Sequence, residues 1–339
     1  MKTLSFIIPL YNSATWLRKC LDSVLNQDLP LEQMEIICVN DGSPDNSADI
    51  AREYSLKYPN TFVVLDQENQ GPSGARNNGM RHATGKYLCF VDPDDYVEPN
   101  VYGKLVKQME DENLDMLRFN YQIVDEEYKP IEKREFEKQF DYSPKLMSGA
   151  EFLATRLDIA CNIWRYMYRR EIITKNGIWC FTGDYYDDTP WLPLVLLKAE
   201  RMNICDTVAY NYKERRDSLV KTKNPMMQIR KLDGFVLLLK YLEDEKKKIT
   251  DGILSADEKW KDGVIAWYKR MEAHAVVSLL TIVGMYLFAV RKDYVNKLNE
   301  LGVFPLFKDT DSKKVLRKIR LANLHPLLLV WFIHIMNFK

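Results

Sequence analysis

The residues best suited to chemistry in this chain of 339 residues lie in the segment 92–95, which reads DPDD. Residues two apart project to the same side of an extended chain, so Asp92 and Asp94 can face one ligand. Carboxylates this close repel unless a cation lies between them, and ligand sets of oxygen alone favour Mg²⁺ or Mn²⁺. The alternative is an ordinary Asp/Pro turn on the surface.

A second acidic segment, NDGSPDNS at 40–47, has two interpretations. Asp-Gly, Ser-Pro and Asn-Ser are typical of turns and of helix N-caps, which is the structural interpretation. Asp41, however, is expected to end a strand, where its carboxylate would accept hydrogen bonds from a nucleobase or a ribose hydroxyl. Both interpretations can hold together.

The segment NQGPSGARNNG at 69–79 places three glycines and Arg76 at the start of an expected helix. Glycine lets the backbone approach a ligand closely, and a helix N-terminus favours anions, so a turn close to a phosphate is plausible. The segment lacks the GxxxxGKS pattern and follows the third expected strand rather than the first. It is therefore neither a P-loop nor a dinucleotide fingerprint.

The elements that must position these residues alternate between short apolar runs and amphipathic stretches. Such alternation predicts a mostly parallel sheet with helices on both faces, in which ligands bind beyond the carboxyl ends of the strands. The three polar segments should therefore meet at one edge of the sheet. The expected strands are 4–8, 35–39, 62–65 and 87–91, and the expected helices are 17–25, 50–54 and 73–83.

Taken in order, PLYN, NDGSPDNS, NQGPSGARNNG and FVDPDDYVEP resemble the N-terminal half of family 2 glycosyltransferases. The segments NIWRYMYRREII, DYYDDTPW and YNYKERRDSL resemble that family's acceptor-side segments, and the resemblance ends near Thr222. It implies a GT-A fold, an α/β architecture with a Rossmann-like, mostly parallel central sheet flanked by helices. The implied catalytic domain is 1–222, with a nucleotide-binding half at 1–100 and an acceptor half at 101–222, and 223–339 would be a helical C-terminal region.

The resemblance also implies roles for single residues. Asp188 matches the general base, although the pair reads Asp187-Asp188 here where the family has Glu-Asp. Arg215 matches an arginine that steadies the diphosphate. Asp92 and Asp94 match the pair that serves ribose and metal. The remaining positions, matched to binding of the nucleoside or nucleotide, are Pro9, Tyr11, Asn12, Asp41 and Arg76.

These roles imply an inverting transfer of one sugar from a nucleoside-diphosphate sugar to a hydroxyl. Breaking the sugar–phosphate bond leaves an anion whose charge Mg²⁺ or Mn²⁺ would offset, while one carboxylate takes the acceptor's proton. UDP is the commonest donor nucleotide in the resembling family. The expected acceptor is a glycan or a lipid-linked molecule in cell-surface polysaccharide biosynthesis. The rivals are a sugar-phosphate nucleotidyltransferase, whose glycine-rich signature is missing after strand one, and an inactive sugar-nucleotide or glycan binder.

The composition indicates which classes of partner and which cell compartment to expect. Lys plus Arg equals Asp plus Glu at 48 each, so no overall basic field would hold a nucleic acid. The six cysteines are scattered and several lie in apolar runs, which predicts buried thiols in a reducing compartment. The N-terminus is interrupted by Pro9 before a signal-peptide core forms. We therefore expect a cytoplasmic protein, with the inner face of the plasma membrane as a possible peripheral site.

The C-terminal third carries no motif but has two apolar runs. Ala273–Val290 is nearly long enough to cross a bilayer, which takes roughly 20 apolar residues, but its polar residues favour a buried helix. Pro326–Met336 is too short to cross. The basic stretch Lys308–Arg320 before it would lie on an anionic membrane surface or form a solvated helix face. Trp164 and Trp191 could stack on sugars, but core packing is the favoured interpretation.

Overall fold

The computed structural model describes residues 2–132, 140–156, 161–181, 188–215, 224–254, 257–308 and 312–337. Contacts within the chain define two compact units. Unit 1 comprises Met1–Gly149, Asn162–Gly183 and Leu194–Arg216, and unit 2 comprises Ala150–Cys161, Asp184–Pro193 and Asp217–Lys339. Two segments from the expected acceptor half thus group with the C-terminal helices. A boundary near residue 222 between independently folding domains stays a prediction.

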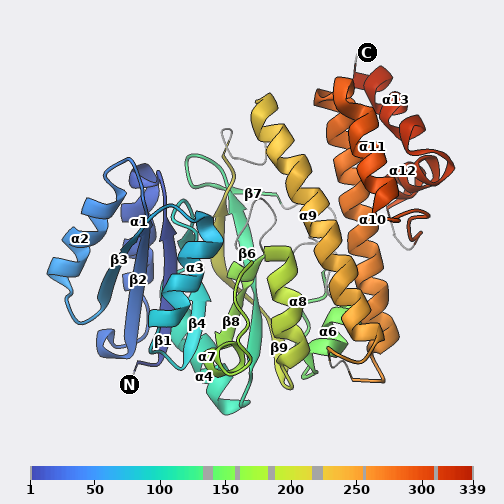
Figure 1. Cartoon of the computed structure of the whole chain (residues 1–339). Coiled ribbons are helices and arrows are strands. Elements are labelled where there is room, and N and C mark those ends of the chain that lie inside the picture. Colours follow the sequence, from blue (N-terminus) through green and yellow to red (C-terminus); the bar gives the residue numbers. More distant parts are fainter. Residues whose placement is uncertain are drawn as a thin grey trace. The chain divides into compact units, whose positions relative to one another are not determined.

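Unit 1 is built on one mixed sheet (Figure 1). Its strand order is β3-β2-β1-β4-β8-β6-β9-β5, and β7 pairs with β6. The first four of these strands are parallel, as expected, whereas β8 and β5 run antiparallel to their neighbours. The strands are β1 (Leu4–Leu10), β2 (Met34–Asp41), β3 (Phe62–Gln67), β4 (Tyr87–Phe90), β5 (Tyr96–Val97), β6 (Met116–Val124), β7 (Pro130–Ile131), β8 (Tyr166–Arg169) and β9 (Met202–Lys213).

Helices of unit 1 cover both faces of the sheet, because alternate residues of a buried strand point to opposite faces. Phe6 and Ile8 lie in the core that includes α1 and α4, whereas Ile7 faces α3, where a Cβ on Gly79 would come within 2.5 Å of its Cγ2. The α-helices are α1 (Ala14–Leu25), α2 (Ser47–Lys57), α3 (Gly71–His82), α4 (Tyr102–Asp111) and α7 (Arg170–Thr174), with 3₁₀ turns η1 (Leu31–Gln33) and η2 (Ile163–Arg165). The predicted strand–helix alternation is confirmed.

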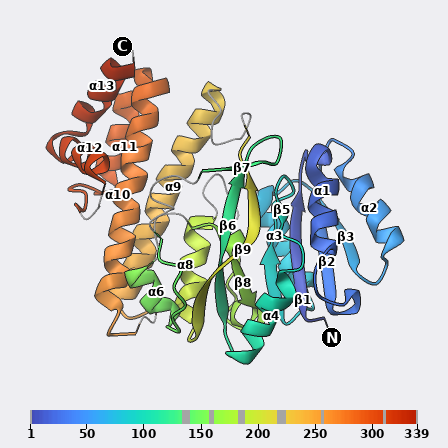
Figure 2. The same cartoon turned by 180° about the vertical axis from the view of Figure 1, so that it is seen from behind.

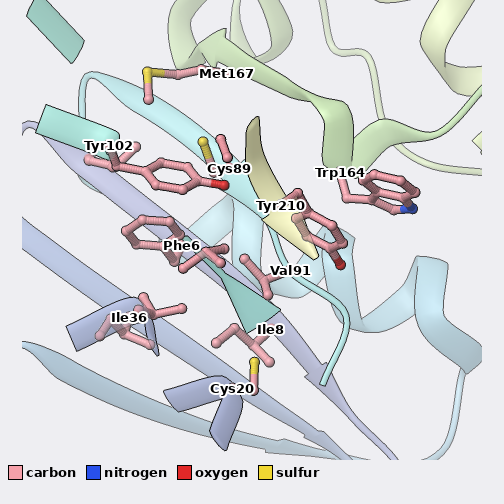
Figure 3. Packing of buried hydrophobic residues seen from close by; sticks show 14 of the residues in the cluster. Phe6, Ile8, Cys20, Ile36, Cys89, Val91, Tyr102, Trp164, Met167 and Tyr210 are labelled. Carbon is pink, nitrogen blue, oxygen red and sulfur yellow. The ribbon is translucent and has the colours of Figure 1, made fainter. Parts of the chain in front are cut away.

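Large aromatic side chains fill the core on the α1 and α4 face (Figure 3). Tyr102 of α4 meets Phe6 edge-on at 5.0 Å between ring centroids. Trp164 stacks on Tyr210 of β9 at 4.3 Å, and only 5% of its surface is exposed. The core interpretation of Trp164 is therefore confirmed. Trp191, in unit 2, is also buried.

The first strand was expected to end before Pro9, but β1 continues to Leu10, so Pro9 is a buried residue of that strand. A charged stretch, Asp125–Lys138, follows β6, and within it β7 folds back antiparallel on β6 as far as Ile131. Most of the rest of that stretch, at 133–138, lies outside the described residues.

Unit 2 is helical (Figure 2). The long helix α10 packs on α9 and α13 and buries most of the apolar stretch that begins at Ala273, so the buried-helix interpretation is confirmed. None of the helices described is both long and apolar enough for a membrane crossing. The elements are α6 (Gly149–Thr155), α8 (Asp188–Lys198, which continues into unit 1), α9 (Pro225–Thr250), α10 (Lys261–Tyr286), η3 (Phe288–Val290), α11 (Arg291–Glu300), α12 (Lys313–Leu324) and α13 (Pro326–Asn337).

Candidate active site

The sheet reverses its direction of growth between β1 and β4. From β1 the chain moves to β2 and β3 on one side, and α3 then returns it to β4 on the other side of β1. The carboxyl ends of β1 and β4 at such a reversal are where open α/β sheets bind ligands. Pro9 lacks an N–H, but β4 pairs with β1 only as far as Ile7, so no ladder bond to β4 is lost there.

The loop Asn40–Ser47, called the first acidic loop here, joins β2 to α2. Asp45 accepts the backbone N–H of Ala14 at 2.8 Å and of Ser47 at 3.0 Å, so one carboxylate serves the starts of both α1 and α2. Burial raises its pKa, but hydrogen bonds from the hydroxyls of Ser43 and Ser47 outweigh that effect and lower it to about 2. The loop is thus a turn, as expected, but the N-cap residue of α2, Asn46, makes no side-chain cap hydrogen bond, and Asp45 bonds the N–H of Ser47 instead.

Asp41, the last residue of β2, is buried and has neutral partners. Its Oδ1 accepts hydrogen bonds from Gln67 Nε2 and from the backbone N–H of Gln70, both at 2.8 Å. Gly42 follows with φ +65°, a conformation that glycine adopts without strain. Asp41 therefore ties the end of β2 to the end of β3 and to the residue that precedes α3.

The turn Asp92–Asp95, called the second acidic loop here, follows β4 and is anchored by its last member. Asp95 is 3% exposed and accepts bonds from the hydroxyl of Tyr210 and the backbone N–H of Lys213, both at 2.7 Å. Burial, together with the charges of Asp94 and Asp92, raises its pKa far above the usual range. Asp95 thus fastens the loop to β9 and leaves the other two acids for a ligand.

Asp92 and Asp94 each pair with an arginine from a different element. Arg76 of α3, itself buried, donates to Asp92 Oδ1 at 2.8 Å. Arg215, just after β9, pairs with Asp94 Oδ2 at 2.8 Å. Burial and the neighbouring Asp92 raise the pKa of Asp94, and the positive charge of Arg215 opposes that shift. Two acids and two arginines thus form one ionic cluster at the reversal point.

Lys213 extends this cluster and was missed by the sequence interpretation. Its ammonium group lies 4.1 Å from the ring centroid of Tyr128 and 6.0 Å from that of Trp16, and the guanidinium of Arg215 lies 4.4 Å from the Trp16 ring. Lys213 and Arg215 are two residues apart at the end of a strand, a spacing that places side chains on the same side. That spacing was the signal available in the sequence.

Asn77, next to Arg76 on α3, is a second residue that the sequence interpretation missed. Its side chain donates to the carbonyl of Cys180 at 2.8 Å and accepts the N–H of Cys180 at 2.7 Å. Arg81, one turn further on, lies over the ring of Trp179 at 4.9 Å. Helix α3 therefore holds the chain at the end of the described segment 161–181.

The other predicted residues are placed as follows. Tyr11 is about half exposed beyond β1, and Asn12, with φ +50°, donates its N–H to Ser43 Oγ at 2.8 Å. Asp188 is the first residue of α8 and is partly buried in unit 2. Asp187 lies outside the described residues. The structure thus brings Asp92, Asp94, Arg76 and Arg215 together, with Asn12 against the first acidic loop.

The acids of the second loop fit a hard cation in number and type. Across the described ranges, no group of three or more His, Cys, Asp or Glu residues gathers as a ready ligand set. Asp92 and Asp94 supply two carboxylates, and each arginine bond engages one oxygen of its partner. Mg²⁺ commonly takes one or two protein carboxylates and completes its shell with substrate phosphates and water. The pair therefore suits a metal that arrives with a diphosphate.

Sequence relatives are named glycosyltransferases. The chain is 34% identical over 218 residues to the uncharacterized glycosyltransferase YibD of Escherichia coli, a match that covers 62% of this chain and 60% of YibD. It is 47% identical over 95 residues to the poly(ribitol-phosphate) beta-glucosyltransferase of Bacillus spizizenii, covering 28% of this chain and 15% of that protein. The match thus spans less than two thirds of either relative.

Solved structures share the fold at low identity. Staphylococcus aureus TarS 1–349 matches with a TM-score of 0.68 at 18% identity and covers 98% of this chain and 89% of its own. Its complex with UDP-GlcNAc matches at 0.63 and 17%, covering 94% and 90%. A mannosyltransferase from Pyrobaculum calidifontis, solved with GDP-Man and Mn²⁺, matches at 0.53 and 15%, covering 99% and 86%. These likenesses show a GT-A-type fold with a helical C-terminal region.

The family model described as glycosyl transferase family 2 matches residues 5–177, slightly more than half of the chain and all of the elements that carry both acidic loops. The chain belongs to glycosyl transferase family 2.

Proposed function

We propose that this glycosyltransferase moves a single sugar from a UDP-sugar to a hydroxyl of a glycan or lipid-linked acceptor, with inversion at the anomeric carbon. The observation that carries the proposal is the ionic cluster of the second acidic loop, in which Asp92 and Asp94 are paired with Arg76 and Arg215. A diphosphate and its cation can exchange into such a cluster without leaving a charge unpaired. Structural neighbours solved with UDP-GlcNAc or with GDP-Man and Mn²⁺ support this donor class.

The nucleoside would bind beyond the ends of β1 and β2. We assign the base and ribose to Tyr11, Asn12 and the remaining carboxylate oxygen of Asp41, because Asp41 Oδ1 already receives two hydrogen bonds. Pro9 is buried in β1 and would act through the shape of the strand end. The exposed ring of Tyr11 offers an apolar surface on which a base can stack.

The diphosphate would bind at the second acidic loop. Asp92 and Asp94 would hold Mg²⁺ or Mn²⁺, which supplies positive charge to the leaving diphosphate. Arg215 and Lys213 lie beside Asp94 and would contact the phosphate oxygens, since guanidinium and ammonium groups are the usual partners of phosphate. Arg76, itself buried, would hold Asp92 in position through their ion pair.

Asp188 would act as the general base that takes the proton of the acceptor hydroxyl, with Asp187 beside it. Its place as the first residue of α8 supports this role, because a helix N-terminus stabilises negative charge. One displacement assisted by one base inverts the anomeric centre, and no covalent sugar–enzyme intermediate is needed.

The acceptor class is inferred from the names of relatives. They include the poly(ribitol-phosphate) glucosyltransferase and proteins of minor teichoic acid biosynthesis in Bacillus subtilis. We therefore propose a role in cell-surface polysaccharide biosynthesis. Donors of this kind are made in the cytoplasm, and the burial of all six cysteines suits its reducing conditions. We accordingly propose a cytoplasmic location.

The purified chain can be screened with nucleotide sugars, with and without Mn²⁺, for thermal stabilisation and for release of the nucleoside diphosphate. We expect Mn²⁺-dependent stabilisation by UDP and by one UDP-sugar, and slow UDP release that an added acceptor accelerates. Pyrophosphate release from UTP and a sugar 1-phosphate would instead identify a nucleotidyltransferase. Binding of UDP-sugars without UDP release under any acceptor would identify an inactive binder.

A further inference from the structure

The outer face of α13 is apolar and exposed. Leu328, Trp331, Phe332 and Ile335 recur at helical spacing and are each about half exposed, so they form one stripe along the helix. Met336 and the end of α12 at Leu324, which is 75% exposed, extend the apolar surface. We refer to these six side chains as the apolar face. Large contiguous apolar surfaces are rare on folded proteins and mark binding sites.

The inner face of α13 packs against α10, so the helix is already docked in the fold while its apolar face stays exposed. Val330 and Ile333 are buried, and a Cβ on Gly284 of α10 would come within 2.9 Å of the Val330 carbonyl. His334 Nδ1 lies 3.2 Å from the Gly284 carbonyl, and its ring stacks on Phe288. The close approach at Gly284 sets which side of α13 remains outside.

A basic stripe lies on the neighbouring helix α12, which packs against α13. Lys313, Arg317 and Arg320 are exposed and spaced by about one and two turns, and Leu324 continues the same side of the helix. The sequence from residue 312 to 339 contains no Asp or Glu, although the whole chain has a formal net charge of zero. The positive charge is therefore local to the helices that carry the apolar face.

We infer that α12 and α13 dock on the surface of a bilayer that contains anionic lipids. The basic stripe would meet the headgroups, and the apolar face would enter the boundary between headgroups and acyl chains. A second copy of the chain fits less well, because an isologous interface over this face would bring two basic stripes towards each other. The docking does not depend on the transfer reaction, so the two proposals fail independently.

The test is co-sedimentation of the full chain with two kinds of vesicle, one of phosphatidylcholine alone and one with about one third phosphatidylglycerol. We expect binding to the anionic vesicles and little to the neutral ones. Arg317→Gln with Arg320→Gln should weaken it by roughly 25-fold, taking about fivefold for each charge. Phe332→Ser with Ile335→Ser should weaken it by at least about tenfold.

Matched controls remove exposed charges or exposed apolar side chains outside α12 and α13. Lys104→Gln with Lys247→Gln removes two exposed charges, and Leu56→Ser with Ile253→Ser removes two exposed apolar side chains, at 85% and 76% exposure. Both should bind vesicles like the unaltered chain, and thermal melts should show all variants folded. Failure to bind anionic vesicles, or binding that survives Phe332→Ser with Ile335→Ser, would overturn the inference. A lipid-free dimer that this variant dissociates, with no vesicle binding, would assign the face to a second copy.

Discussion

The two acidic loops follow β2 and β4, the strands on either side of β1, yet their carboxylates have different partners. In the first loop, Asp41 and Asp45 accept hydrogen bonds from amides, hydroxyls and backbone N–H groups, all of them neutral. In the second loop, Asp92 and Asp94 face arginines. The neutral donors belong to the fold and stay bound to Asp41 and Asp45. In an ion pair, by contrast, a metal cation can take the place of the arginine beside the carboxylate. We therefore expect Asp45 to serve mainly the fold, and Asp92 and Asp94 to exchange their arginine partners for a cation.

The largest expected effect concerns an acid on neither loop. Asp188→Asn should lower the transfer rate by roughly 10² to 10⁴, because a general base is lost, while donor affinity stays within about twofold. Transfer rates and calorimetric donor binding measure the two effects. Asp262→Asn, which removes another acid from the first turn of a helix, is the matched control and should leave both unchanged. Normal transfer by the Asp188 variant would remove the residue from the mechanism.

A second prediction compares how much the two ion pairs of the second acidic loop contribute to stability. Arg76→Ala should lower the free energy of unfolding by about 3 kcal/mol, because the nearly fully buried Arg76 side chain loses its packing and Asp92 loses its partner. Arg215→Ala should cost less, about 1 kcal/mol, because Arg215 is about one fifth exposed, whereas the acids left behind are similarly exposed, at 25% for Asp92 and 22% for Asp94. Urea unfolding measures both. Equal losses would contradict the assigned difference in burial.

The third prediction tests whether the second loop exchanges ions. Asp94→Ala should weaken donor binding at least about tenfold in Mn²⁺, because one of two carboxylate ligands is lost. With the metal chelated, the variant and the unaltered chain should bind donor equally weakly. Asp45→Asn serves as the counterpart from the first loop and should leave the Mn²⁺ dependence intact. A similar loss in both variants would erase the distinction between the loops.

The smallest expected effect is on the pH dependence of stability. Asp45 has a pKa of about 2 in the fold, below its ordinary value of 3.8, so its contribution is present above about pH 4 and is lost as the pH falls through 2. Because the side chain is partly exposed, we expect about 1 kcal/mol. Asp45→Asn should lower stability by this amount at pH 7, and the difference should shrink below pH 4. A constant difference down to pH 2 would argue against this origin.

Local pattern was enough to predict the parallel half of the sheet. The runs 4–8 and 35–39 are short, apolar and separated by amphipathic stretches, and they became β1 and β2 with a shift of one or two residues at their ends. Pro9 was placed outside the strand because the apolar run ends at Ile8. It is tolerated in β1 because the neighbouring β4 stops before it.

Partners distant in the chain could not be predicted. The DPDD spacing suggested that Asp92 and Asp94 act together, but nothing local shows that Asp95 is the buried member, since its partner Tyr210 is 115 residues away. Asn77 was passed over for the same reason, because Cys180 is 103 residues further on. The roles of Asp188 and Arg215 came from family resemblance, and both stay predictions.

Helix α3 acts as a rigid spacer between two parts of the molecule. Arg76 and Asn77 are consecutive, so their side chains leave the helix about 100° apart, one towards Asp92 and the other towards Cys180. Because Gly79 lets the helix lie directly on Ile7, the helix cannot slide without a clash. Any displacement of α3 would strain both the Arg76–Asp92 ion pair and the two hydrogen bonds between the Asn77 side chain and the Cys180 backbone. The distance between Asp92 and Cys180 is therefore set by the width of a single helix.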